Sequence, residues 1–223
     1  MTIRLILASQ SPRRREYLSL LGMPFEVSVA DVDEAPHTAE TPADMARRLS
    51  AAKARVVAAA TAAADGGDDT VVIAGDTVVS LGGAVLGKPR DSTEATEMLV
   101  SLRSRPHTVY SGVALLDTGN GRLASDIAET QVFMRDYSAD EIAAYIASGD
   151  PFDKAGGYAI QFEEFHPVAR IGGCYLTVIG LPLCHITRNL RRWGIELGHD
   201  VPAACQAYTG RICPVYEAIL ADG

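Results

Sequence analysis

Basic and aromatic residues are scarce in this chain of 223 residues. Lysine and arginine number 20 against 28 aspartates and glutamates, which gives a net charge of −8, and aromatic residues make up only 6% of the sequence. A protein that binds nucleic acid through a broad surface needs a continuous basic face and aromatic side chains for stacking. The composition therefore excludes a nucleic-acid partner of that kind, and any anion-binding site must be local.

Long apolar runs are also missing. No segment is long and apolar enough to cross a bilayer. The first residues enter a predicted strand without the basic segment, apolar segment and cleavage pattern of a signal peptide. We therefore expect no membrane partner and a cytoplasmic location.

Cysteine is limited to four positions, with no CxxC spacing: Cys174, Cys184, Cys205 and Cys213. Nothing in the sequence indicates an oxidising compartment, so the first interpretation is that all four are reduced structural thiols. A zinc site and a Cys205–Cys213 disulfide remain open as alternatives.

The stretch of residues 5–22 organises the rest of the chain. It predicts a buried strand, a tight loop and a helix that begins with Ser11 as its N-cap and Pro12 in the first turn. Because the first turn of a helix carries unpaired N–H groups, Ser9, Ser11, Arg13 and Arg14 would make a phosphate-binding corner there. The alternative is that the arginines form an ordinary solvated helix face.

Two further stretches supply carboxylates and a lysine. Residues 31–34 hold three acids before Pro36, among them Glu34, and read equally well as a polar turn or as a metal-binding loop. Thr41 and Pro42 begin a helix that runs to about residue 65, with an apolar stripe and with Lys53 inside that stripe: Met45, Leu49, Val56 and Ala60. A lysine in that place needs an anionic partner at an edge or cleft.

Residues 70–81 contain two strand-like apolar runs around Gly75-Asp76-Thr77. A lone buried carboxylate is costly, so Asp76 is expected either to pair with an arginine or to serve in metal binding or catalysis, and we favour the latter. A hairpin at Gly82–Gly83 would bring Lys88 back toward Asp76.

The remaining pattern alternates strands and helices. Strands are predicted at 25–29, 107–117, 123–135 and 175–179, and helices at 91–102, 138–148, 182–193 and 215–220. The glycines of the segment 152–161 would suit either close backbone approach to a ligand or a structural turn.

Taken together, the motifs resemble a known family. Residues 8–14 (Ala-Ser-Gln-Ser-Pro-Arg-Arg), 75–77 (Gly-Asp-Thr), 87–89 (Gly-Lys-Pro), 153–156 (Asp-Lys-Ala-Gly) with Gln161, and 180–182 (Gly-Leu-Pro) occur in the order typical of the Maf nucleoside triphosphate pyrophosphatases. The resemblance runs from about residue 3 to 193. It implies a mixed α/β fold like that of inosine triphosphatase, with a long curved sheet, flanking helices and two lobes around a cleft. It also implies that the protein is a homodimer.

The resemblance also implies a reaction in which a nucleoside triphosphate and water give the monophosphate and pyrophosphate. It implies a divalent cation (Mg²⁺ or Mn²⁺) held by Glu34 and Asp76, with Asp76 as general base. Arg13, Thr77 and Gln161 would tune substrate choice. The expected substrate-binding residues are Ser9, Ser11, Arg13, Arg14, Lys53, Thr77, Lys88, Asp153, Lys154 and Gln161.

The version of the motif at 153–161 resembles the branch that acts on dTTP and UTP. The amide of Gln161 can accept from N3–H and donate to O4 of uracil or thymine, whereas cytosine presents the reverse pattern. Alternatives are the 7-methyl-GTP branch of the same family and a nucleotide-binding regulator of septum formation. Residues 162–168 and 172–174 depart from the family pattern. We expect a pyrophosphatase domain at 1–195 and an extension of unknown role at 196–223.

Overall fold

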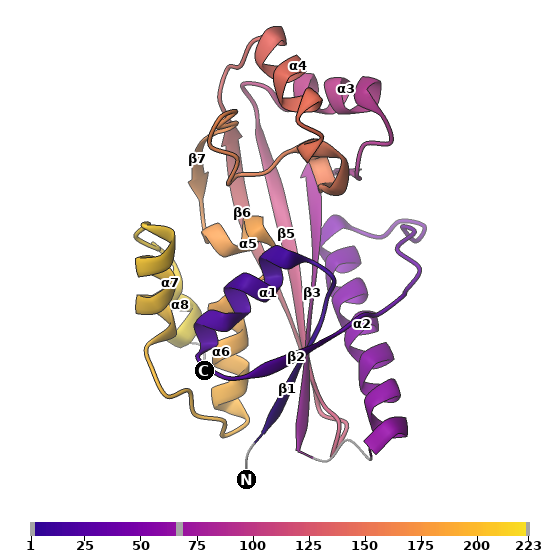
Figure 1. The fold of residues 1–223 in the computed structure, drawn as a ribbon, viewed down its shortest axis with the longest axis vertical. Helices are drawn as coiled ribbons and strands as arrows, with labels where there is room; N and C mark the ends of the chain where they lie inside the picture. Colours follow the sequence, from indigo (N-terminus) through magenta and orange to yellow (C-terminus); the bar gives the residue numbers. More distant parts are fainter. Residues whose placement is uncertain (1–2, 66–68, 222–223) are drawn as a thin grey trace.

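The longest strands run through the whole molecule and carry the rest of it (Figure 1). The computed structural model describes residues 3–65 and 69–221. Its elements, in chain order, are β1 (Arg4–Ala8), α1 (Pro12–Leu18), β2 (Phe25–Ser28), α2 (Pro42–Asp65), β3 (Thr70–Leu81), β4 (Ala84–Leu86), α3 (Ser92–Leu102), β5 (Pro106–Asp117), β6 (Leu123–Met134), α4 (Ala139–Ala147), β7 (Val168–Gly172), α5 (Tyr175–Ile179), α6 (Leu183–Arg192), α7 (Val201–Thr209) and α8 (Tyr216–Ala221). Short 3-10 turns lie at Ser19–Leu21, Asp150–Asp153 and Ala155–Gly157.

The strands form one mixed sheet in the order β2-β1-β3-β5-β6-β7, with β4 added to the end of β3. The pairs β1–β2 and β1–β3 are parallel, and the others are antiparallel. The hairpin at Gly82–Gly83 forms as expected, because both glycines adopt the positive φ that this turn needs. The mixed α/β fold predicted from the sequence is confirmed.

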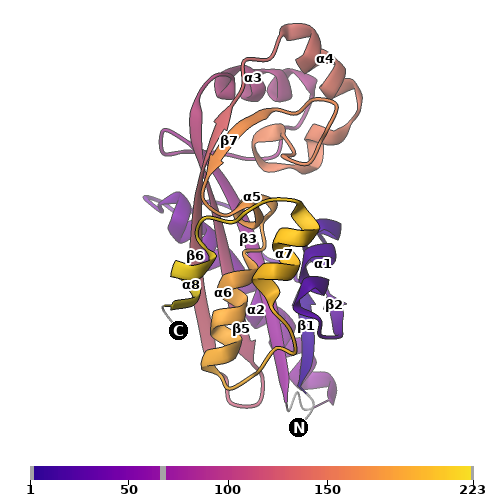
Figure 2. The same ribbon diagram turned by 90° about the vertical axis from the view of Figure 1, so that its left-hand side faces the viewer.

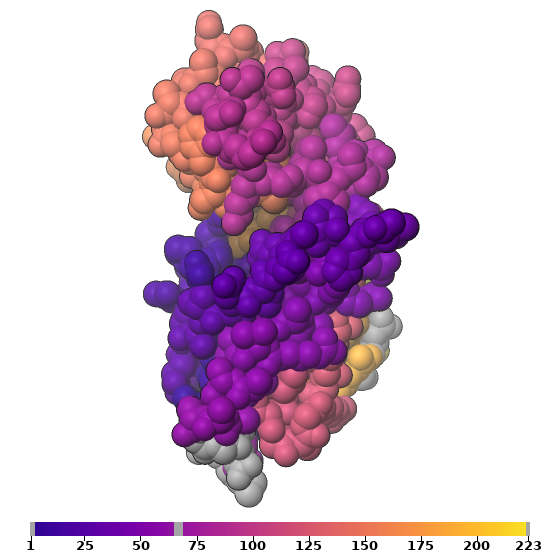
Figure 3. All heavy atoms as spheres, turned by 90° about the vertical axis from the view of Figure 1, so that its right-hand side faces the viewer, coloured from indigo at the N-terminus to yellow at the C-terminus, as the bar shows by residue number. Residues whose placement is uncertain are grey.

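Both faces of the lower sheet are buried, as the alternation of side chains requires. Leu5, Leu7 and Ile73 pack with α1, α5 and α6 on one face, whereas Ile6 and Val72 pack against α2 on the other. A separate core fills the upper part of the molecule under α3 and α4. The long strands β3, β5 and β6 join these two lobes, and Figure 3 shows the surface hollowed between them.

Two local expectations were wrong. Residues 175–179 form helix α5 rather than a strand, since a five-residue apolar run has no period long enough to distinguish the two, and Gly180 ends the segment with a left-handed φ of 103°. The stretch 70–81 is one continuous strand without a break at Gly75.

The apolar stripe of α2 also lies one position away from the one expected. Met45 and Leu49 are buried, but Val56 is 43% exposed, and Val57 and Ala58 face the sheet instead. A repeat of 3.6 residues per turn carries the stripe from 49 through 53 to 57, and so leaves Val56 on the solvent side.

Candidate active site

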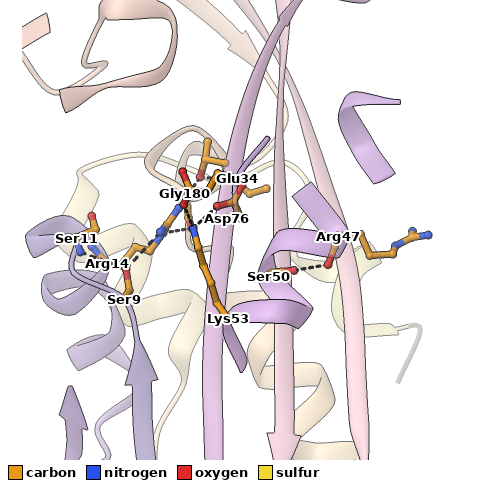
Figure 4. Close-up of polar contacts among 11 residues, drawn as sticks. Ser9, Ser11, Arg14, Glu34, Arg47, Ser50, Lys53, Asp76 and Gly180 are labelled. Atoms are coloured by element: carbon orange, nitrogen blue, oxygen red, sulfur yellow. Dashed lines mark hydrogen bonds and ion pairs between the residues drawn. The ribbon is translucent and has the colours of Figure 1, made fainter. Parts of the chain in front are cut away.

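The carboxylate of Asp76 lies at the centre of the sheet, where the two lobes meet. Its residue is 7% exposed, and β3 pairs it across to Gly112 of β5. The ammonium of Lys53, from α2, lies 2.6 Å from Asp76 Oδ1 and 2.6 Å from Glu34 Oε1 (Figure 4). Three side chains from a strand, a helix and the loop after β2 therefore meet at one point, and Lys53 has the anionic partner that the sequence required.

The two carboxyl groups differ in their environment. Burial raises the pKa of Asp76 above its ordinary 3.8, although the charges of Lys53 and Arg14 oppose this. Burial also acts to raise the pKa of Glu34, but the hydrogen bond and the charge of Lys53 outweigh it, so this pKa is lowered. Asp76 is thus the better proton acceptor of the two.

Arg14 connects three segments beneath this cluster. Its Nε donates to the carbonyl of Gly180 at 2.9 Å, and its two terminal nitrogens donate to Thr77 Oγ1 at 3.0 Å and to Ser9 Oγ at 3.3 Å. These acceptors are neutral, and the charge of Arg14 is offset in part by the nearby carboxylates of Asp76 and Glu34. Burial lowers the pKa of Arg14, and the negative charge of Asp76 partly offsets that.

Thr77 links Arg14 to the buried Ser111, because its hydroxyl contacts both side chains. Ser111 Oγ donates to the carbonyl of Thr177 at 2.7 Å, so its single proton is used. The hydroxyl of Thr77, 3.2 Å away, therefore donates to Ser111. Sequence reasoning missed Ser111 and Thr177, since nothing local indicates that β5 and α5 would meet β3 here.

The serines of the first loop hold its shape. Ser11 is the N-cap of α1, as predicted, and its Oγ accepts from the N–H of Arg14 at 3.4 Å. Ser9 Oγ accepts from the N–H of Ser11 at 3.2 Å. Both hydroxyls are thus placed at the start of α1, and their contact with a substrate stays a prediction.

Arg13 and Lys88 act on this region through charge. Arg13 is half-buried, and its charge acts to lower the pKa of Asp153 in the upper lobe. Lys88 is exposed after β4, and its charge acts to lower the pKa of Glu34. Arg13 thus acts on a carboxylate of the upper lobe, and Lys88 acts on one of the two carboxylates beside Lys53.

Lys154 is engaged within the upper lobe. Its ammonium donates to the carbonyl and carboxylate of Asp150, at 2.7 and 2.8 Å, and to Asp153 Oδ1 at 2.5 Å. The hydrogen bond from Gly156 N to the Gly87 carbonyl, 2.9 Å, joins this turn to the Gly87–Pro89 segment. A role of Lys154 and Asp153 in substrate binding stays a prediction, and their visible contacts organise the turn.

The glycines of this turn have a packing reason. Gly156 has φ 74°, and a Cβ there would lie 3.0 Å from a methyl group of Val79. The turn and its packing against Val79 therefore explain the glycine at position 156 without a ligand.

Gln161 reaches back across the molecule to the first helix. Its Nε2 donates to the hydroxyl of Tyr17 at 3.1 Å. Tyr17 is 4% exposed, and its ring meets the ring of Tyr208 edge-on at 5.5 Å. The side chain of Gln161 is thereby anchored to a residue that the sequence analysis did not single out. Because a tyrosine hydroxyl both donates and accepts, the contact suits either orientation of the amide.

The donor set suits a hard divalent cation. The two oxygens that flank Lys53 are at most 5.2 Å apart (2.6 + 2.6), and both are carboxylate oxygens of the kind Mg²⁺ and Mn²⁺ prefer. Across residues 3–65 and 69–221, no group of three His, Cys, Asp or Glu side chains is gathered for a metal. Glu34 and Asp76 would therefore hold a cation together with substrate oxygens and water.

The structure is that of an α/β protein with an open mixed sheet, in which a half-buried arginine and two carboxylates lie where the two lobes meet. The chain belongs to the Maf family, because the model described as Maf-like protein matches residues 4–193.

Several relatives called dTTP/UTP pyrophosphatase align with this chain over about the same length as the family model. The one from Geotalea uraniireducens is 45% identical over 190 residues, which cover 85% of this chain and 95% of the relative. That of Salinibacter ruber is 46% identical over 189 residues, or 84% and 89% of the two chains. Among solved structures, the Ham1 protein of Staphylococcus aureus matches 60% of this chain and 72% of its own, with 14% identity and a TM-score of 0.39.

In the described part of the chain, no helix is long and apolar enough to cross a membrane.

Proposed function

We propose that this protein is a nucleoside triphosphate pyrophosphatase that hydrolyses dTTP and UTP to the monophosphate and pyrophosphate. The observation that carries the proposal is the meeting of Asp76, Lys53 and Glu34 beside the buried Arg14. The names of the relatives at 38–46% identity support the same substrates.

Asp76 is suited to the proton transfer. Lys53 engages its Oδ1, so Oδ2 is the oxygen that would accept a proton from the attacking water. The hydroxide formed would add to the α-phosphorus, the bond from that phosphorus to the bridging oxygen would break, and pyrophosphate would leave. The raised pKa of Asp76 helps, because a stronger base takes the proton more readily.

The cations provide the second requirement, which is neutralisation of the triphosphate. Arg13 and Lys88 would provide positive charge to the phosphates, and the half-buried Arg14 would add a third. A divalent cation bound by Glu34 and Asp76 would supply further positive charge to the phosphate oxygens.

Gln161 is suited to choose the base. With one N–H given to Tyr17, its other N–H and its carbonyl oxygen can pair with O4 and N3–H of uracil or thymine. The choice of base rests on this orientation, since the flipped amide would pair with cytosine instead.

The test is pyrophosphate release by the purified protein with Mg²⁺, measured for dTTP, UTP, CTP, GTP, ATP and 7-methyl-GTP. Preferential turnover of dTTP and UTP is expected. Turnover of 7-methyl-GTP alone would overturn the substrate assignment but keep the chemistry. Tight nucleotide binding with no turnover would instead favour a regulator of septum formation.

We further propose a homodimer that acts in the cytoplasm, with a divalent cation as cofactor. The family resemblance supports the dimer, and the four free thiols suit a reducing compartment. Light scattering should give twice the 23.7 kDa mass of one chain, and a mass of one chain would contradict the dimer. EDTA should abolish activity, and Mg²⁺ or Mn²⁺ should restore it.

A further inference from the structure

Three cysteines line one cavity. Its lining residues come from α7, from the segment between α7 and α8 and from residues around the start of α5; Figure 2 shows where these helices lie. The cavity measures about 200 Å³, and its lining includes Cys174, just before α5, Cys205 on α7, and Cys213 between α7 and α8. Cys213 lies after residue 193, where the match to the family ends, whereas Cys174 lies within that match. The cavity therefore joins the C-terminal segment to the family fold.

Cys174 and Cys213 form a directly interacting pair. Both side chains line the same cavity, and each thiol changes the pKa of the other. The contact with Cys174 and polar backbone groups lower the pKa of Cys213 below its ordinary value of 9.0. The contact with Cys213 and burial raise the pKa of Cys174 well above 9.0, so Cys174 keeps its proton when Cys213 ionises.

The other two cysteines lack this activation. Burial raises the pKa of Cys205 to about 11 and that of Cys184 to about 12, so both remain thiols at neutral pH. The charged neighbour at the cavity is Arg211, whose guanidinium lies 4.8 Å from the ring centre of Tyr175. Cys213 is therefore the most acidic thiol of the group, and it lines the same cavity as Cys174.

We propose that Cys213 and Cys174 are a thiol–disulfide site, oxidised by a small disulfide such as oxidised glutathione. The Cys213 thiolate attacks one sulfur of the small disulfide, the S–S bond breaks, and one glutathione thiolate leaves. Cys174 then gives up its proton and attacks the Cys213 sulfur, which releases the second glutathione as a thiol. The protein loses two hydrogen atoms and two electrons, and the small disulfide gains them.

The bond would fasten the C-terminal segment to a wall of the candidate active site. Cys174 precedes α5, and the carbonyl of Gly180 at the end of α5 accepts the hydrogen bond from Arg14. The same segment also contacts α1, where Tyr208 packs on Tyr17 and hydrogen-bonds Glu16. Oxidation would thus covalently join parts that are otherwise held by packing, independently of whether the enzyme activity is as proposed.

The test uses the full chain incubated with oxidised glutathione at pH 7, followed by alkylation and peptide mass spectrometry. A disulfide-linked peptide containing Cys174 and Cys213 is expected, with a mass loss of about 2 Da that dithiothreitol reverses. The midpoint of thermal unfolding should rise by about 4 °C or more, since the link closes the loop from 174 to 213. Cys205→Ser should behave like the wild type.

Three results would overturn the proposal. One is a Cys205–Cys213 linkage, which was an alternative from the sequence. Another is a glutathione adduct that persists on Cys213, because Cys174 would then not reach it. The third is no modification of Cys213 under conditions that oxidise a reference dithiol. Cys213→Ser, which changes a half-exposed residue and leaves Cys174 in place, should fold and resist oxidation.

Discussion

The ammonium of Lys53 lies 2.6 Å from Asp76 Oδ1, and the same nitrogen lies 2.6 Å from Glu34 Oε1. Lys53 comes from a helix on one face of the sheet, and Asp76 from its central strand. The lysine is therefore a positioning residue for both carboxylates.

Lys53→Met should lower kcat/KM for UTP by about 100-fold or more, because the carboxylates lose the charge that holds them. The measurement is steady-state pyrophosphate release. Arg55→Met, on an exposed position of the same helix, is the matched control and should keep its activity. Near-normal rates for Lys53→Met would mean that the lysine has no part in the reaction.

Without added metal, the carboxyl carbon of Asp76 should titrate above 3.8, as measured by carbon NMR of labelled aspartate. Burial raises the pKa of Asp76, whereas the charge of Lys53 lowers it. Lys53→Met should therefore move the titration of Asp76 to still higher pH. The sign has a consequence for stability, because ionising a carboxyl of raised pKa disfavours the folded state. A titration at or below 3.8 would contradict the burial argument.

Gln161→Ala should lower kcat/KM for UTP and dTTP by about 10-fold or more, while the midpoint of thermal unfolding stays near that of the wild type. Gln131→Ala, at an exposed position of β6, is the control. Equal losses for uracil, thymine, cytosine and purine substrates would show that the amide does not select the base.

Tyr17→Phe tests the same pair from the other side. The ring stays in the core, but Gln161 loses the hydroxyl that accepts from Nε2. The preference for UTP over CTP should fall by about 5-fold, because the amide loses the hydrogen bond that anchors it beside the base. Tyr216→Phe, on α8, should leave that ratio unchanged.

Gly112→Ala should lower the free energy of unfolding by about 3 kcal/mol or more. A Cβ at this position would lie 2.0 Å from the carbonyl oxygen of Ala46 and 2.7 Å from Ser50 Oγ, so α2 would have to move off β5. Gly198→Ala meets nothing within 4 Å and is the control. Chemical denaturation of both variants measures the difference.

Features set by neighbouring residues could be predicted from the sequence. Ser11 caps α1 because its side chain reaches the N–H of Arg14, the third residue of that helix, and the hairpin at Gly82–Gly83 follows from the backbone freedom of glycine. The need of Lys53 for an anion followed from its place in an apolar stripe. Helix α7 carried an N-cap at Asp200 and a left-handed Gly210 at its end, which are signals that could have revealed it.

Features set by distant residues could not be predicted in this way. The acceptor for Arg14 is the carbonyl of Gly180, which lies 166 positions away, and Tyr17 meets Gln161 over 144 positions. No spacing rule connects such pairs, because the sheet brings them together. The contacts of Lys154 show the same limit, since its ammonium turns to Asp150 within its own lobe. The division of the chain at residue 195 also stays a prediction.

The most direct test of the account is UTP hydrolysis in water enriched in oxygen-18, with the wild type and Asp76→Asn compared by mass spectrometry of the products. Attack at the α-phosphorus predicts the label in UMP and unlabelled pyrophosphate. The asparagine variant should fold and bind UTP but lose about 1000-fold or more in rate. Label in pyrophosphate or inorganic phosphate, or an asparagine variant with near-normal rate, would contradict the central claim.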